Sequence, residues 1–159
     1  MKRLSLRCAA LAFLVSCQSA AASAAPAAKA CSSPAVRAEV SATIRAFFAA
    51  LAVDDDAKLR RLTTPDFYAF EVGKRFTGPE LFKLIAETHK SGRTIQWNIG
   101  EVDARTDCRL AFAAWENVGA AGPAGKLEPR SWLESAMLVR QGGRWAIAFL
   151  HSTPKDPRK

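Results

Sequence analysis

Beyond residue 30, the residue types best suited to catalysis or metal binding are two histidines, His89 and His151, and two cysteines, Cys31 and Cys108. Their separations do not match the short spacing of a zinc site, so we expect no metal. No Ser/His/Asp or Cys/His spacing supports a nucleophile. Residues 54–56 are three consecutive aspartates, but no loop with calcium-ligand spacing follows them. Capping of a helix explains these aspartates better.

The two cysteines are a candidate disulfide, because an even pair in an oxidising compartment commonly bonds. A Cys31–Cys108 bridge would join the start of the first predicted helix to a strand. Closing such a long loop would contribute roughly 4 kcal/mol to stability. The alternative is two unpaired thiols that lie too far apart to bond.

The first 24 residues show the three parts of a bacterial secretory signal in order. A basic start precedes a short apolar stretch, residues 8–15, and small residues follow, ending in the small-x-small pattern of residues 22–24. The apolar stretch is too short to span a bilayer. We therefore expect residues 1–24 to be a signal peptide and the protein to be exported, to the periplasm or the medium.

A second processing site overlaps this one, because residues 14–17 resemble a lipobox. Cleavage there would leave a lipidated Cys17 at the new N-terminus and anchor the protein in the envelope. Membrane attachment is expected only in that case, since no run of 18 apolar residues occurs later. Residues 25–33 are predicted to be a linker, residues 34–154 a folded domain and residues 155–159 a disordered tail.

The charge of the chain gives little reason to expect a nucleic-acid partner. The 159 residues fit one domain and carry a formal net charge of +8. Without the three basic residues of the leader, the chain has 20 basic and 15 acidic residues, which gives a net charge of +5. The basic residues are scattered and lack the interleaved aromatic residues of a single-strand platform. A solvated basic surface is the better explanation.

Three segments have the signature of helices. In residues 34–51 apolar residues recur at helical spacing after Ser33 and a proline, which are predicted to cap the helix. Asp54 is predicted to cap a second, short helix. Residues 77–80, Thr-Gly-Pro-Glu, form a capping box that opens a third helix.

The rest of the chain has mainly strand character, with residues 119–125 predicted to be a loop and residues 141–143 a tight hairpin turn. Trp145, Ile147 and Phe149 share strand parity and are expected to face the same side. Three helices and a long antiparallel meander predict an α+β domain, with the helices on one face of a curved sheet. The predicted strands are residues 67–72, 95–99, 108–118, 131–140 and 144–151.

All four tryptophans fall in the sheet half, namely Trp97, Trp115, Trp132 and Trp145. They could line an apolar pocket for a flat or aliphatic ligand. The polar anchors of such a pocket would be Tyr68, Glu116 and Asn117. The alternative is packing in the core or at a dimer interface, which we expect for at least two of the four.

The order of these motifs resembles the nuclear transport factor 2-like (NTF2-like) superfamily, in particular its bacterial SnoaL-like branch. The resemblance covers about residues 34–154. It implies a cone in which a curved sheet and helices enclose one pocket, often in a homodimer formed through the sheet's outer face. The fold hosts isomerases, dehydratases, epoxide hydrolases, cyclases and non-catalytic binding domains, so the residues must decide the function. The matching segments are residues 47–51, 54–62, 66–68, 76–78, 143–147 and 151–153.

Two residues become candidates for acid–base catalysis through this resemblance. Glu71 lies about where ketosteroid-isomerase-like members keep a carboxylate base, whose pKa an apolar pocket would have to raise. The carboxylic acid that those enzymes place on a later strand would correspond to Ser135, with neighbouring Glu134 on the opposite face. His151, at the end of the last strand, could be an acid–base group or a ligand partner. The alternatives are a solvent-facing Glu71 paired with a nearby basic residue, and a structural His151.

Three functions are compatible with this sequence. The first is an exported domain that binds a small, partly apolar molecule without catalysis. The second is a cofactor-independent isomerase or dehydratase, which requires Glu71 or His151 to face the cavity beside a second polar group. The third is a dimeric assembly module, which requires a filled cavity and a large exposed apolar sheet face. A domain that only binds its ligand would have an apolar cavity without a carboxyl group of shifted pKa.

Overall fold

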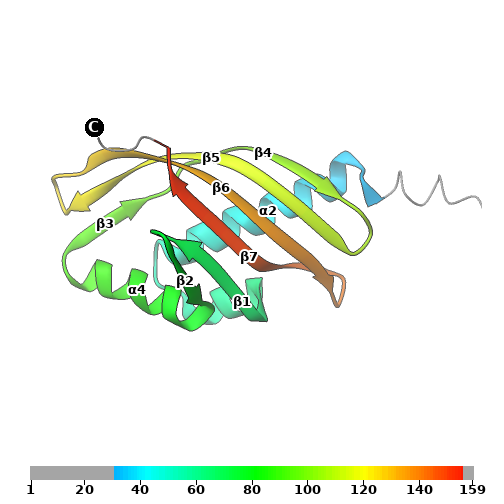
Figure 1. Cartoon of the computed structure of the whole chain (residues 1–159), viewed down its shortest axis with the longest axis horizontal. Coiled ribbons are helices and arrows are strands. Elements are labelled where there is room, and N and C mark those ends of the chain that lie inside the picture. Colours follow the sequence, from blue (N-terminus) through cyan, green and yellow to red (C-terminus); the bar gives the residue numbers. More distant parts are fainter. Residues whose placement is uncertain (1–30, 156–159) are drawn as a thin grey trace, which may run out of the picture.

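The computed structural model describes residues 31–155 (Figure 1). The predicted signal peptide (residues 1–24), Cys17, most of the linker and the tail after Lys155 lie outside the described residues. No helix within the described range is long and apolar enough to cross a membrane. The helices are α2 (Pro34–Leu51), α3 (Asp56–Leu62) and α4 (Gly78–Lys90). The strands are β1 (Thr63–Glu71), β2 (Lys74–Thr77), β3 (Arg93–Gln96), β4 (Ile99–Thr106), β5 (Leu110–Pro123), β6 (Glu128–Gln141) and β7 (Arg144–Pro154).

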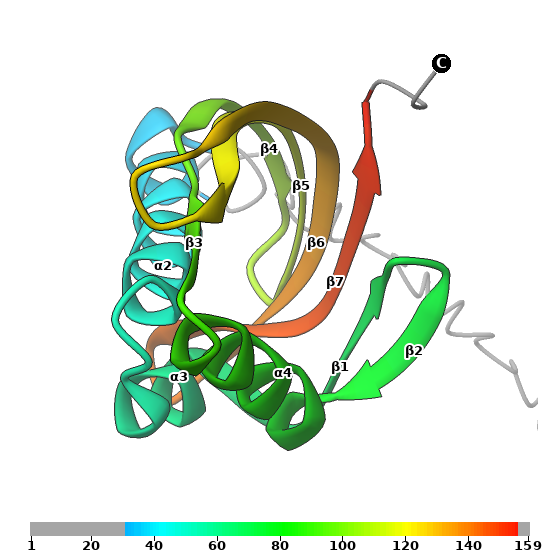
Figure 2. The ribbon, with the colours of Figure 1, turned by 90° about the vertical axis from the view of Figure 1, so that its left-hand side faces the viewer.

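The strands form one curled sheet with the helices on its concave side (Figure 2). The order is β2-β1-β7-β6-β5-β3, and β4 pairs with β5 beside β3. All pairs are antiparallel except β1 with β7, which are parallel. The core lies between α2 and the concave face, around residues such as Ile44, Phe47 and Leu138, all fully buried. The predicted α+β cone is confirmed.

Helix caps explain where the short helices begin. Asp55, not Asp54, is the N-cap of α3, so the predicted cap was displaced by one residue. Asp54 adopts a left-handed conformation with φ 54° and instead lies 2.9 Å from Nδ1 of His89 at the end of α4. The predicted capping box of α4 is confirmed. The carboxylate of Glu80 accepts hydrogen bonds of 2.8 Å from the backbone N–H and the hydroxyl of Thr77.

The segment predicted as a loop, residues 119–125, lies mostly in a strand, so that prediction was wrong. β5 continues to Pro123 and pairs with β3 on one side and β6 on the other. At Gly119 an added Cβ would lie 1.9 Å from the carbonyl oxygen of Gln96. The glycine therefore permits two strands to approach closely, and does not mark a turn.

A register shift in β7 reverses the expected direction of Phe149. Met137 pairs with Phe149 while Leu138 pairs with Ile147, which leaves Ala148 as the extra residue of a bulge. Trp145 and Ile147 are buried in the core, whereas the Phe149 ring lies 5.0 Å from that of Tyr68 on the convex face. The prediction that Trp145, Ile147 and Phe149 face one side was therefore wrong.

The convex face of the sheet carries a row of apolar side chains. Phe112 pairs with Met137, Met137 with Phe149, and Phe149 with Tyr68, so these four residues cross β5, β6, β7 and β1 in register. Phe112 is 49% exposed and Met137 is 47% exposed. We call these four residues the convex row.

A disulfide joins Cys31, just before α2, to Cys108 in the turn between β4 and β5, with a Cα–Cα distance of 4.8 Å. The hydroxyl of Thr106 also hydrogen-bonds to the carbonyl oxygen of Cys31. In the same turn, the Asp107 carboxylate accepts the backbone N–H groups of two following residues. The start of α2 is thus held to the sheet at a turn with its own local hydrogen bonds.

Val72 is in an unfavourable backbone conformation at the turn between β1 and β2, where its φ is 46° and that of Gly73 is 74°. A left-handed conformation costs an L-residue about 1–2 kcal/mol, whereas asparagine tolerates it better. The Val72 side chain is 62% exposed, so it contributes little packing energy. We therefore expect Val72→Asn to raise the free energy of unfolding in urea by about 1 kcal/mol. Val53→Asn, at another exposed valine, should give no gain; equal effects of both substitutions would contradict this explanation.

Candidate acid–base site

Glu134 is a buried carboxyl group on the concave face of β6, only 5% exposed. Its Oε2 accepts hydrogen bonds from Nε1 of Trp115 at 2.7 Å and from Nδ2 of Asn117 at 2.9 Å. Both donors come from the neighbouring strand β5, where Trp115 is the direct partner of Glu134. Because Oε2 already accepts two hydrogen bonds, a proton on this carboxyl group belongs on Oε1.

Asn117 is itself held in one orientation. It is completely buried, and its Oδ1 accepts the backbone N–H of Asn98 at 3.0 Å, in the break between β3 and β4. Its Nδ2 must therefore face Glu134 as a donor. The local backbone break thus orients the amide that holds the acid.

Ser152 lies between Glu134 and a second acid, Glu71. Ser152 is the direct partner of Glu134 across β6 and β7, and it is only 5% exposed. On the other side, Phe70 pairs with His151, which brings Glu71, at the end of β1, beside Ser152. The Ser152 hydroxyl is close enough to both carboxyl groups to lower the pKa of each. Strand register thus assembles two acids and a hydroxyl group from β1, β6 and β7.

Both acids bind protons more tightly than ordinary carboxyl groups. Burial raises the pKa of Glu134 from 4.5 to about 7, against the opposing effect of its hydrogen bonds, and the nearby charge of Glu71 adds to the rise. Burial also raises the pKa of Glu71, while hydrogen bonds from Ser152 and from the backbone N–H of Val72 oppose that rise. Because each charge disfavours the other, we expect the pair to hold about one proton near neutral pH.

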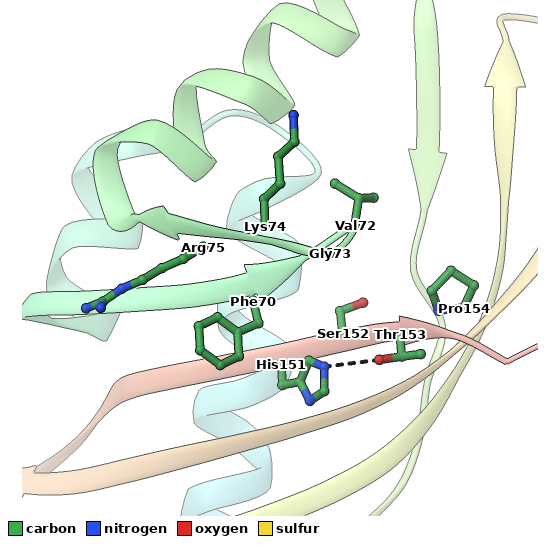
Figure 3. A pocket seen from close by; sticks show the side chains of 9 residues that line it. All are labelled: Phe70, Val72, Gly73, Lys74, Arg75, His151, Ser152, Thr153 and Pro154. Atoms are coloured by element: carbon green, nitrogen blue, oxygen red, sulfur yellow. Dashed lines mark hydrogen bonds between the residues drawn. The ribbon is translucent and has the colours of Figure 1, made fainter.

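A hollow of about 450 Å³ opens in the angle where β1 turns into β2 and β7 continues past it (Figure 3). Ser152 lines this hollow, so a bound molecule could reach the hydroxyl group that contacts both acids. Phe70, Val72 and Pro154 give it apolar walls. The side chain of Lys74 also lines it.

Of the two candidate bases, only Glu71 lies beside a second acid. His151 projects from the convex side of β7, exposed, with Nε2 3.1 Å from the hydroxyl of Thr153. It lines the hollow but makes no described contact with the acid pair. The second acid is Glu134 and not Ser135, which corrects the predicted parity of β6. Leu133, Ser135 and Met137 belong to the convex side.

The predicted pocket residues divide between the two faces. Tyr68 lies on the convex face, where the guanidinium group of Arg75 is 4.2 Å from the centre of the Tyr68 ring. The prediction that Tyr68 lines the pocket was therefore wrong. Trp97 and Trp115 pack on Phe48 of α2, with ring centres 5.8 and 6.0 Å away. Trp132 is the cross-strand partner of Asn117.

Trp145 is buried in the core, and the predicted polar anchor Glu116 forms an ion pair of 2.6 Å with Lys155. Within residues 31–155, no three His, Cys, Asp or Glu side chains gather as a metal-binding group.

Residues 40–156 match the SnoaL-like domain family. The chain belongs to the SnoaL-like family. No curated protein sequence matches this SnoaL-like protein. Its solved structural neighbours carry NTF2-like and cystatin-like fold names, which agrees with the cone of helices and curled sheet.

Three neighbours illustrate the range of this fold. An NTF2-like protein from Streptomyces avermitilis, provisionally named a dehydratase, is 17% identical with a TM-score of 0.67, over 79% of this chain and 100% of that one. A ketosteroid isomerase-like protein from Erwinia carotovora atroseptica is 20% identical with a TM-score of 0.62, over 76% and 96%. The association domain of C. elegans CaMKII is 16% identical with a TM-score of 0.64, over 75% and 95%. At such identities the likeness shows the fold alone.

Proposed function

We propose that this SnoaL-like protein is a cofactor-independent acid–base enzyme of the isomerase or dehydratase kind, acting on a small, partly apolar molecule. The observation that carries the proposal is the pair Glu71 and Glu134, which the strand register places on either side of Ser152, a residue that lines the hollow. A site that only binds an apolar molecule has no need of two acids with raised pKa values. The names of the dehydratase and isomerase-like neighbours agree with this chemistry.

In this proposal each group has a role. Glu71, half-buried and flanked in the chain by two residues that line the hollow, Phe70 and Val72, acts in this proposal as the general base that removes a proton from a carbon next to a carbonyl group. Ser152 donates a hydrogen bond to the oxygen on which negative charge develops, while protonated Glu134 donates through Oε1 to Ser152. Return of the proton from Glu71 to another carbon completes an isomerisation. Loss of a β-hydroxyl group as water, with the proton supplied from the acid pair, completes a dehydration.

Hydrogen exchange on carbon tests this proposal without knowledge of the natural substrate. Enolisable ketones such as 2-tetralone are incubated with the protein in D2O, and loss of the α-hydrogen signal is followed by proton NMR. We expect Glu71→Gln to slow the protein-catalysed exchange at least about 100-fold, because general-base catalysis is typically worth that much. Asp66→Asn, an exposed acid on the same strand, is the matched control and should not change the rate. Equal exchange rates for Glu71→Gln and the wild type would refute the role of Glu71.

A second proposal concerns assembly, and it rests on the convex row. A row of large apolar side chains across four strands, exposed at Phe112 and Met137 and half-buried at Phe149 and Tyr68, is typical of a surface that another copy of the chain covers. We expect a homodimer through this face. Phe112→Glu should place charges in the interface and reduce the mass measured by sedimentation equilibrium to that of one chain. Val53→Glu, at an exposed valine between α2 and α3, should leave the dimer intact. A wild-type monomer would contradict the proposal.

We also propose that the protein is exported, to the periplasm or the medium, or held in the envelope if Cys17 is lipidated. The bond between Cys31 and Cys108 supports an oxidising compartment.

A further inference from the structure

We propose that the molecule bound in the hollow is an organic acid whose carboxylate is held by Lys74, with its apolar body against Val72 and Pro154. This inference rests on the proposed function, because it names the class of substrate for the same acid–base site. The hollow is lined by nine residues, and none of them is acidic.

The position of Lys74 is defined by the strand register. Lys74 is the direct partner of Glu71 across β1 and β2, so both residues belong to the same face of this hairpin. Figure 3 shows the side chains of Lys74 and Ser152 directed to one side of the ribbon, with Phe70 and His151 directed to the other. A ligand that reaches Ser152 from the hollow therefore lies on the side from which Lys74 projects.

The ammonium group of Lys74 has no described partner. No hydrogen bond or ion pair joins it to another residue within residues 31–155, the carboxylate of Glu71 included. The second cation of the hollow, Arg75, is engaged over the ring of Tyr68. Lys74 is therefore the group available to an anion that enters the hollow.

The charges of the site also favour an acid with one carboxylate. Glu71 must be charged to act as a base, and a second negative charge beside it would be repelled unless a cation balanced it. Lys74 supplies that cation. The substrate that fits is a small oxo acid, with its carboxylate at Lys74, its carbonyl oxygen at Ser152 and the reacting C–H group at Glu71.

A matched pair of probes tests the inference by binding alone. The dissociation constants of 2-naphthoate and of its neutral isostere 2-naphthamide are measured from shifts of the backbone amide signals of Val72, Gly73 and Thr153. We expect 2-naphthoate to bind about tenfold more tightly than the amide, and Lys74→Met to abolish this difference by weakening the naphthoate alone. Lys126→Met, at an exposed lysine between β5 and β6, should preserve the difference. Because Lys74 is exposed, we expect Lys74→Met to fold like the wild type. A circular dichroism spectrum equal to that of the wild type checks this.

Equal affinities for the two probes, a preference that survives in Lys74→Met, or no binding of either probe in the hollow would each overturn the inference. Glu71→Gln distinguishes this failure from failure of the proposed function. If the preference for naphthoate holds while Glu71→Gln leaves carbon-hydrogen exchange unchanged, the anion site stands and the catalytic role of Glu71 falls.

Discussion

At pH 8 the Glu134→Gln variant is expected to be more stable than the wild type by about 3 kcal/mol. The pKa of Glu134 is raised from 4.5 to about 7 in the folded protein, so the folded state binds this proton more tightly than the unfolded state does. The resulting stability is fully present below pH 4.5 and is lost as the pH rises through 7. Glutamine carries no charge, and its amide oxygen can still accept the hydrogen bonds of Trp115 and Asn117.

Urea unfolding at pH 5 and at pH 8 measures this effect. The two proteins should differ little at pH 5, and the advantage of Glu134→Gln should develop between the two values. Glu101→Gln, an exposed acid on β4, is the control and should follow the wild type at both pH values. An advantage of the same size at pH 5 and pH 8 would mean that Glu134 is not protonated in the folded protein near neutral pH.

Loss of the disulfide is expected to lower the free energy of unfolding by about 4 kcal/mol. The bond spans 77 residues, and it restricts the unfolded chain across α2, α3, α4 and half the sheet. Its removal also frees the start of α2, where Thr106 contacts Cys31. The double variant Cys31→Ser/Cys108→Ser should therefore unfold at a clearly lower urea concentration than the oxidised wild type.

Reduction supplies the control for this experiment. Dithiothreitol should bring the wild type to the stability of the double variant and leave the double variant unchanged. The prediction fails if the oxidised wild type and the double variant have the same unfolding midpoint.

Sequence patterns were sufficient where a feature depends on residues close together in the chain. The cap at Ser33, the box of Thr77 and Glu80, and the turn at Gly142 and Gly143 involve neighbours within a few residues. The helical periodicity of residues 34–51 is likewise local. The order of these features along the chain was sufficient to predict an α+β cone and to indicate a resemblance to the SnoaL-like family.

The faces of the strands could not be read from alternation alone. On β6 both parities are largely apolar, because Leu133 and Met137 cover the convex face while Ala136 and Leu138 fill the core. Hydrophobicity therefore gave no preference between Glu134 and Ser135 for the concave face. The bulge at Ala148 is also absent from any local pattern, since it arises from pairing with a distant strand.

The sequence by itself determined the helices, the tight turns and the order of elements. Through the family resemblance it also indicated Glu71 as a candidate base. Only the tertiary structure identified its partner, because Glu134, Ser152 and Glu71 lie on three strands and meet only through the register of β6, β7 and β1. The raised pKa of each acid is likewise a tertiary property, since it results mainly from burial. A carboxyl group acquires that burial only when the sheet curls over α2.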